Sequence, residues 1–303
     1  MMMTDVNPAN TETRNTKSER LHQFTTLEII ELMNEEDHSV PVIVKGALPQ
    51  IEKVIDQAVA VMRNGGKLYY FGAGTSGRLG VLDASECPPT FGVAADLVNG
   101  IIAGGDRALR FPIEGAEDSK ETGVEDVQKH VTSNDMVIGI ASSGRTPYVI
   151  GAIEAANEMG VPTAGVVCNR GSELSTLVTY SIELPVGAEV VTGSTRLKAG
   201  TAQKMVLNMI TTASMVKLGK VYKNLMVNVQ ASNEKLRKRT VSIVQELTGV
   251  TQEEAERYSK EAEGDARVAV IMILLKVKVD EAKEMIERTG GNFAEVMKGI
   301  EKK

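Results

Sequence analysis

Leu68–Arg78 reads LYYFGAGTSGR, and this stretch decides the fold of the chain. An apolar run ends in a turn of glycine and hydroxyl residues, and the turn leads into a segment that can be helical. A second copy of the pattern stands at Met136–Thr146, which reads MVIGIASSGRT. The order strand, turn, helix therefore occurs twice, each time with the dipeptide Gly-Arg at the end of the turn.

Both turns have the composition of a phosphate-binding site. Backbone N–H groups at the start of a helix are free to donate, the helix dipole favours an anion there, and Ser, Thr and Arg side chains add further donors. One such turn could be merely a turn, but two related turns favour a small phosphorylated ligand. The residues that we expect to hold it are Thr75, Ser76, Gly77, Arg78, Ser142, Ser143, Arg145 and Thr146.

Neither turn matches the standard nucleotide motifs. The glycines from Gly72 to Gly77 lack the acidic partner on a second strand that a dinucleotide ribose requires, and no Gly-Lys-Ser/Thr P-loop is present. The expected ligand therefore remains a small phosphorylated molecule that neither of these motifs would bind.

The region from residue 68 to residue 184 alternates between short apolar runs and helical patterns. Helices are expected at 76–86, 117–130 and 147–159, and strands at Leu68–Phe71, Leu97–Ile102, Met136–Ala141, Thr163–Cys168 and Tyr180–Leu184. Such alternation predicts βαβ units and a parallel sheet that is buried on both faces. Ligands of these sheets bind at the carboxyl ends of the strands, where both turns would lie.

Helices are predicted on both sides of this α/β region. Thr25 and Glu28 form a capping box that opens a short helix, and a longer helix begins near Pro41. Ala199–Gly219 is predicted to be an apolar helix in the core or in a subunit interface. We expect three parts: a disordered tail at residues 1–20, an α/β domain with the phosphate turns at 21–231 and a small helical domain at 232–303.

Composition excludes several classes of protein. A net charge of -6 and a pI near 5.4 argue against a nucleic-acid surface, and the basic run Lys235–Arg239 is interpreted as a solvated helix face. No apolar stretch is long enough to cross a membrane, and the N-terminus lacks an apolar signal core. We expect a cytoplasmic protein that binds neither nucleic acid nor membrane.

Metal and nucleophile chemistry find little support in the sequence. His22, His38 and His130 are widely separated and lack a ligand spacing, so no metal site is expected. Cys87 has no His partner and is interpreted as a packing residue. Carboxylates remain for proton transfer, in Asp83–Pro89 and in Glu114–Asp118, although helix capping or surface exposure would explain each of them equally well.

Five blocks of the chain closely resemble the bacterial N-acetylmuramic acid 6-phosphate etherases, and the resemblance runs from about Thr25 to the C-terminus. The blocks are Gly72–Gly80, Asp83–Thr90, Glu114–Asp118, Ala141–Tyr148 and Gly187–Lys204. The resemblance implies a sugar isomerase (SIS) fold, which is a three-layer αβα sandwich, followed by a small helical domain. It also implies Glu86 and Glu117 as the catalytic pair, with no cofactor.

The implied reaction cleaves the lactyl ether at C3 of the sugar and gives N-acetylglucosamine 6-phosphate and D-lactate during cell-wall recycling. An alkoxide is a poor leaving group, but opening the sugar ring to the aldehyde makes the C2 proton acidic enough for a carboxylate to remove. Elimination of lactate and addition of water at C3 would follow. The resemblance suggests Glu86 as the acid that assists departure and Glu117 as the second acid or base, and the order of the proton transfers stays open.

Two other functions remain open at this point. A sugar-phosphate isomerase would share the fold and the phosphate turns, yet it would not need the Asp83–Glu86 block followed by two prolines. A non-catalytic regulator that senses a sugar phosphate is built on related domains, as in the longer glucokinase regulatory protein. Of the three, only an etherase releases lactate.

The spacing along the first predicted helix suggests a dimer. Ten residues separate Ser76 from Glu86, which places them about 15 Å apart along a helix axis. A single sugar cannot comfortably bridge that distance. Either the helix bends at Gly80, or Glu86 serves the pocket of a neighbouring chain in a symmetric homodimer, which is the arrangement we expect.

Overall fold

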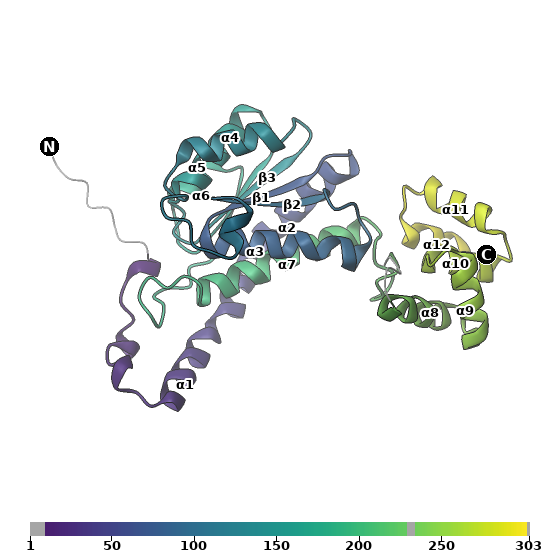
Figure 1. Cartoon of the computed structure of the whole chain (residues 1–303), viewed down its shortest axis with the longest axis horizontal. Coiled ribbons are helices and arrows are strands. Elements are labelled where there is room, and N and C mark those ends of the chain that lie inside the picture. Colours follow the sequence, from purple (N-terminus) through teal and green to yellow (C-terminus); the bar gives the residue numbers. More distant parts are fainter. Residues whose placement is uncertain (1–9, 229–233, 302–303) are drawn as a thin grey trace. The chain divides into compact units, whose positions relative to one another are not determined.

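The computed structural model describes residues 10–228 and 234–301. Their contacts divide the chain into two compact units, one made of residues up to 85 with 96–211, and the other made of residues 86–95 with those from 212 onward (Figure 1). The division differs from the expected boundary at residue 231, because it falls inside the helix α7, Lys198–Lys217. A helix that continues across a boundary leaves no linker for the sequence to reveal.

The first unit contains a five-stranded sheet, and all of its strand pairs are parallel, as predicted. The strand order is β2-β1-β3-β4-β5, so the strands of the two signature stretches are direct neighbours. Gly72 at the end of β1 pairs with Ile140 near the end of β3. The strands are β1 Leu68–Gly72, β2 Val98–Ile102, β3 Met136–Ala141, β4 Thr163–Val167 and β5 Tyr180–Glu183.

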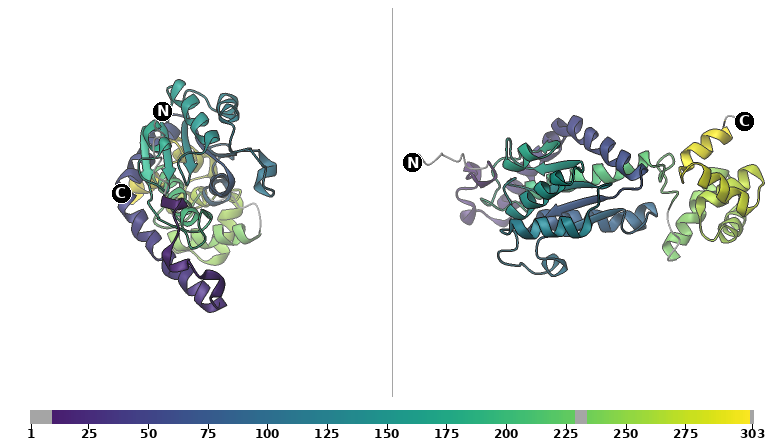
Figure 2. Two further views of the ribbon diagram at one scale, coloured as in Figure 1. Left: turned by 90° about the vertical axis from the view of Figure 1, so that its left-hand side faces the viewer. Right: turned by 90° about the horizontal axis from the view of Figure 1, so that it is seen from above.

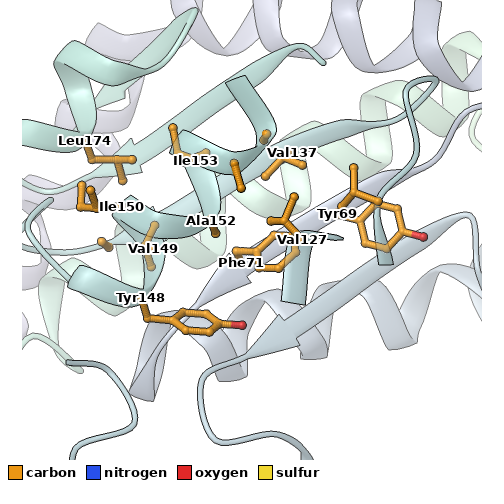
Figure 3. Close-up of a cluster of buried hydrophobic side chains, with 14 of the residues drawn as sticks. Tyr69, Phe71, Val127, Val137, Tyr148, Val149, Ile150, Ala152, Ile153 and Leu174 are labelled. Atoms are coloured by element: carbon orange, nitrogen blue, oxygen red, sulfur yellow. The ribbon is translucent and has the colours of Figure 1, made fainter. Parts of the chain in front are cut away.

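Helices cover both faces of this sheet and form the expected αβα sandwich (Figures 1 and 2). One face buries a cluster in which Tyr69, Phe71 and Val137 of the strands meet Val127 of α4 and Val149 of α5 (Figure 3). The other face is covered by α3. Besides the first part of α7, the helices of this unit are α1 Thr26–Asp37, α2 Ser39–Arg63, α3 Gly74–Phe91 as far as residue 85, α4 Lys120–His130, α5 Pro147–Glu158 and α6 Glu173–Leu177.

Two short elements differ from the expectations. The helix α6 follows β4 and is capped by Ser172, whose Oγ accepts the N–H of Ser175; its five residues are too few to show a periodic pattern in the sequence. At the N-terminus, residues 10–18 include two 3₁₀ turns rather than a disordered segment. Thr11 is fully buried, and the amide of Asn169 satisfies its polar groups. The N–H of Thr11 donates to Oδ1 of Asn169, and Nδ2 of Asn169 donates to the hydroxyl of Thr11. The rest of the expected tail, residues 1–9, lies outside the described residues.

The helix α3 continues past the prolines that were expected to end it. Pro88 and Pro89 stand inside α3, and the helix stops one turn later, where the N–H of Gly92 donates to the carbonyl of Pro88. Each of the two prolines lacks an N–H and therefore removes one backbone hydrogen bond of α3, while the bond from Gly92 to Pro88 still closes the last turn. Gly80 does not mark a bend: a Cβ there would lie 3.0 Å from Cβ of Tyr70, so the glycine allows α3 to approach β1 closely.

A buried carboxylate joins α3 to α7. Asp83 is 5% exposed and accepts hydrogen bonds from the hydroxyl of Tyr70, the amide of Asn208 and the hydroxyl of Thr211. Burial raises the pKa of the Asp83 carboxyl, and these three donors act in the opposite direction. Asp83 was grouped with the candidate acids in the sequence, but its position within the core gives it a structural role.

Replacement of Asp83 by Ala is expected to lower the free energy of unfolding by about 3 kcal/mol, because three buried donors would lose their acceptor. Urea unfolding followed by circular dichroism measures the change. Ser85→Ala is the matched control on the same helix, since the exposed hydroxyl of Ser85 donates only to the carbonyl of Leu82. Equal stability of the two variants would show that the Asp83 network contributes little.

The second unit is helical, as expected, and has a core of its own. The ring of Tyr222 meets that of Phe293 edge to face at 5.4 Å, and the apolar helix α10 lies within the core. Thr251 and Glu254 form a capping box at the start of α9. Residues 232 and 233, where the first helix of this unit was expected to begin, lie outside the described residues. Its helices are α8 Glu234–Thr248, α9 Gln252–Glu261, α10 Ala266–Leu275, α11 Val279–Arg288 and α12 Phe293–Glu301.

Within residues 10–228 and 234–301, no helix combines the length and the apolar character that a membrane span requires. The helix α7 buries Ala199, Val206 and Ile210 within the chain itself. Of the two predicted roles for its apolar residues, the structure supports the core.

Candidate active site

The two signature turns lie side by side at the carboxyl end of the sheet. They follow β1 and β3, which are hydrogen-bonded neighbours, and the strand order reverses its direction between them. Parallel sheets bind ligands at such a switch point. The second turn leads into α5, whereas the residues expected in the first turn already form the first turn of α3, which begins at Gly74 and not at residue 76 as predicted. Two helix N-termini therefore lie where the sequence predicted a phosphate.

The second turn offers several donors in a rigid frame. The hydroxyl of Ser143 accepts the N–H of Arg145, and Gly144 adopts a φ of +69°. A Cβ at Gly144 would lie 2.2 Å from the hydroxyl of Ser172, so only glycine fits this close approach. Thr146 is the N-cap residue of α5, yet its hydroxyl makes no capping hydrogen bond. This hydroxyl can therefore serve a ligand at the start of α5.

A residue that the sequence reasoning missed connects the two turns. Ser76 of the first turn donates to Oε1 of Gln203 at 2.9 Å, and Nε2 of Gln203 donates to the hydroxyl of Ser142 at 3.2 Å. Gln203 lies on α7 and is fully buried. The only signal for it was its place in the block Gly187–Lys204, where nothing in the residue type points to a ligand.

A pocket of about 270 Å³ opens beside the first turn. Gly74 and Arg78 of α3 contribute to its wall, and small apolar residues such as Ala103 and Ala108 line it as well. Its carboxylates come from the segment before α4, namely Glu114, Glu117 and Asp118. The structure therefore brings the candidate Glu117 to the edge of the phosphate turns, together with its sequence neighbour Glu114.

The loop that carries Glu117 is held against α5. The helix that was expected from residue 117 begins at Lys120, so Glu117 lies in a loop rather than in a first helical turn. Its carbonyl accepts the N–H of Tyr148, two residues beyond Thr146. A Cβ at Gly123 would lie 2.0 Å from the carbonyl oxygen of Tyr148. The glycine therefore allows α4 and α5 to approach closely. The position of Glu117 is thus linked directly to the second turn.

Arg78 lines the pocket, and two of its N–H groups donate to backbone carbonyls. Its Nη2 donates to the carbonyl of Ala108 at 2.7 Å and its Nε to the carbonyl of Leu109 at 3.2 Å. Both carbonyls belong to the 3₁₀ turn Asp106–Leu109, which follows β2. Arg78 therefore shapes the pocket wall as well as contributing positive charge, a role that its place in the Gly-Arg motif did not indicate.

Replacement of Arg78 by Lys is expected to lower kcat/KM by about tenfold, since Lys keeps the charge but lacks the planar donor set that holds both carbonyls. Steady-state kinetics measures the loss. Limited proteolysis of residues 103–119 should become faster in the same variant, because the turn at Asp106–Leu109 would lose its anchor. Unchanged kinetics with unchanged proteolysis would mean that charge alone matters at this position.

Glu86 lies on α3, one turn beyond Asp83, and its side chain is exposed. It is not among the residues that line the pocket of Glu117. Ten helical residues separate it from Ser76, which corresponds to about 15 Å along the axis. The structure thus brings together the two turns and Glu117, and places Glu86 farther along the same uninterrupted helix.

The cysteines have no visible part in this chemistry. Cys87 and Cys168 are buried and make no disulfide, as expected for packing residues. Burial raises the pKa of the Cys168 thiol to about 12, so the thiol stays protonated. Among the described residues, no group of three or more His, Cys, Asp or Glu side chains is arranged to hold a metal ion.

A five-stranded parallel sheet with two hydroxyl-rich turns at its switch point is the architecture of a sugar isomerase (SIS) domain. The SIS domain model matches residues 116–213, and the model of the glucokinase regulatory protein N-terminal SIS domain matches residues 50–157. A third model, the C-terminal lid domain of glucokinase regulatory protein, matches residues 223–262. A phosphoheptose isomerase structure from Francisella tularensis shares the fold, with a TM-score of 0.53 and 17% identity over 64% of this chain and 100% of that one.

Curated relatives give a finer assignment. The chain is 54% identical to the N-acetylmuramic acid 6-phosphate etherase of Halalkalibacterium halodurans over 93% of this chain and 95% of that protein. It is 52% identical to the protein of the same name from a Geobacillus species, over 93% of this chain and 96% of that one. The chain belongs to the N-acetylmuramic acid 6-phosphate etherase family.

Proposed function

We propose that this enzyme cleaves the D-lactyl ether of N-acetylmuramic acid 6-phosphate and releases N-acetylglucosamine 6-phosphate and D-lactate. The observation that carries the proposal is 54% identity to an etherase of this name over 93% of the chain. The site agrees with it, because Glu117 lies in a pocket beside two turns suited to a phosphate. These similarities favour the etherase over the isomerase and the non-catalytic regulator.

In the proposed mechanism the two turns hold the phosphate and thereby orient the distant end of the sugar. Binding energy at this end places the reacting carbons beside the carboxylates. The N-termini of α3 and α5 supply backbone N–H groups, and Ser142 and Thr146 supply hydroxyls. The open-chain aldehyde makes the C2 proton acidic, and Glu117 lies in the pocket where such a proton could be transferred.

The remaining steps require an acid and a water molecule. After the C2 proton is lost, the electron pair forms a C2–C3 double bond and expels the lactate oxygen, which Glu86 protonates in this proposal. Water then adds to C3 of the unsaturated aldehyde, and a proton returns to C2. The balance is one ether consumed, one water consumed and one lactate released, with no oxidant or cofactor.

We further propose that the enzyme is a cytoplasmic homodimer that serves cell-wall recycling. The exposed apolar side chains of Leu27 and Ile30 on α1 and of Val42 on α2 support a subunit contact in this part of the chain. The dimer would allow Glu86 of one subunit to reach the pocket of its partner.

The decisive experiment incubates the purified protein with N-acetylmuramic acid 6-phosphate and measures D-lactate. In water enriched in ¹⁸O, the label should appear at C3 of the amino sugar and not in the lactate, because elimination followed by hydration places a solvent oxygen on the sugar. Label in the lactate would indicate displacement at the lactyl carbon instead. An isomerase or a regulator would release no lactate.

Truncation of a phosphate-binding hydroxyl should act mainly on substrate binding. Ser142→Ala and Thr146→Ala are each expected to cost about 1–2 kcal/mol, or roughly five- to thirtyfold in KM, for one lost charge-assisted hydrogen bond. Steady-state kinetics separates KM from kcat. The dephosphorylated sugar should be a poor substrate for the unaltered enzyme, and equal activity on both sugars would remove the basis for a phosphate site at these turns.

A further inference from the structure

We propose that Gln203 is a positioning residue for the phosphate site: its side-chain amide sets the spacing of the two turns and determines which serine hydroxyl can donate to the ligand. The inference rests on the proposed function, since it concerns how the same site recognises its phosphate. No motif in the sequence marked this residue.

The bridge made by Gln203 is short and shielded from water. Oε1 accepts from Ser76 at 2.9 Å, and Nε2 donates to Ser142 at 3.2 Å. Gln203 is 0% exposed, Ser76 6% and Ser142 9%. Hydrogen bonds in such surroundings are costly to break without replacement, so one amide group connects the turn after β1 with the turn after β3.

The helix that carries Gln203 is anchored on both sides of it. At the start of α7, the buried carboxylate of Glu189 accepts the N–H groups of Lys198 and Ala199 at 3.1 and 3.0 Å. Further along, Asn208 and Thr211 donate to the buried Asp83 of α3. Gln203 therefore projects from a fixed helix, and the distance between the turns follows from the length of its side chain.

The directions of the two hydrogen bonds give the two serines different abilities to donate to the ligand. A hydroxyl has a single proton, and Ser76 uses its proton on Gln203. Ser142 instead accepts from Gln203 and keeps its proton. The hydroxyl of Ser142 also hydrogen-bonds the sulfur of Cys168, and sulfur is a weak acceptor that a phosphate oxygen can replace.

A phosphate oxygen offers lone pairs only, so it needs a donor. While the bridge is intact, Ser142 can donate to the phosphate, and the hydroxyl of Ser76 cannot. If the amide of Gln203 had the opposite orientation, the hydroxyl of Ser76 could donate to the phosphate and that of Ser142 could not. Removal of the amide would release the proton of Ser76 and allow both turns to move.

The test compares Gln203→Leu with a matched control on the same helix. Thr211→Val also removes a buried hydrogen bond of α7, but Thr211 does not touch the turns. Gln203→Leu is expected to raise KM by about tenfold or more with kcat changed less than about threefold, whereas Thr211→Val should leave KM unchanged. An equal rise of KM in both variants would overturn the proposal, because it would show a general effect of loosening α7.

A second measurement does not depend on turnover. Inorganic phosphate should raise the thermal unfolding midpoint of the unaltered protein, and Gln203→Leu should lose most of this shift. Gln203→Glu is the nearly isosteric alternative if the Leu variant does not fold; it keeps an acceptor for Ser76 but cannot donate to Ser142 and adds negative charge, so the shift should vanish. A full phosphate shift in a folded Gln203 variant would disprove the positioning role.

The assignment of the protons is tested by combining substitutions. Ser76→Ala breaks the same bridge, so it should weaken phosphate binding about as much as Gln203→Leu does. In the Gln203→Leu background the freed hydroxyl of Ser76 can donate, so Ser76→Ala should weaken binding by about a further fivefold or more. No further loss in that background would show that Ser76 does not gain a donor role. If the protein releases no D-lactate while these phosphate effects hold, the proposed reaction fails and this inference stands.

Discussion

Glu117→Gln is expected to lower kcat by about a hundredfold or more while KM stays within about threefold of its original value. The substitution removes the group that exchanges a proton and nearly preserves the shape of the pocket. Because the carbonyl of Glu117 is held by the N–H of Tyr148 through the backbone, the loop should keep its position in the variant. Steady-state kinetics with D-lactate as the measured product gives both constants.

Glu114→Gln is the matched control for this experiment. Glu114 lines the same pocket, lies in the same loop and is exposed like Glu117. If Glu117 performs the proton transfer, Glu114→Gln should keep kcat within about threefold of the original value. The reverse pattern, with near-normal turnover in Glu117→Gln and a large loss in Glu114→Gln, would transfer the role to Glu114.

Mixing two inactive variants is expected to restore activity if Glu86 serves the pocket of a partner subunit. Glu86→Gln and Glu117→Gln homodimers each lack one member of the pair at both sites. A hybrid dimer contains one site in which both glutamates are intact. Random exchange makes half of the dimers hybrid, so about a quarter of all sites, and about a quarter of the original activity, should return.

The course of α3 bears on the two explanations for the distance between Ser76 and Glu86, which the mixing experiment tests. The helix α3 runs uninterrupted from Gly74 to Phe91, and Gly80 packs on Tyr70 instead of marking a bend. Ser76 and Glu86 therefore keep the full helical separation. Subunits with different tags allow exchange to be verified and the fraction of hybrids to be measured. Verified exchange without recovery would show that Glu86 does not act across a subunit boundary.

Local sequence was sufficient wherever the structure depends on neighbouring residues. The apolar run and the glycine-rich stretch at Leu68–Arg78 predicted a strand, a turn and a helix; the strand and the helix are present, but α3 begins already at Gly74, so the residues expected in the turn form its first helical turn. The capping box at Thr25 predicted the start of α1 to the residue, because the hydrogen bonds involved span only three positions. The parallel sheet followed from uniformly apolar strands that alternate with helices.

The same local information failed where a distant partner decides the outcome. Pro88 and Pro89 predicted the end of α3, but each removes only its own backbone hydrogen bond, and the helix continues to Phe91. The polar residues before residue 20 predicted disorder, whereas the amide of Asn169 gives Thr11 a buried partner 158 positions away. Composition cannot reveal such a partner.

The candidate site likewise contains residues that the local sequence could identify and contacts that only the tertiary structure determines. Ser76, Ser142 and Glu117 could be selected from their turns and from a family resemblance, since residue type and spacing carry that information. Strand order, which makes β1 and β3 neighbours, depends on hydrogen bonds between segments that are far apart in the chain. Gln203 can bridge the turns only because α7 packs beside them. Arg78 can donate to two carbonyls only because the turn after β2 packs against α3. These contacts follow from tertiary packing, which places groups within hydrogen-bonding distance regardless of their separation in sequence.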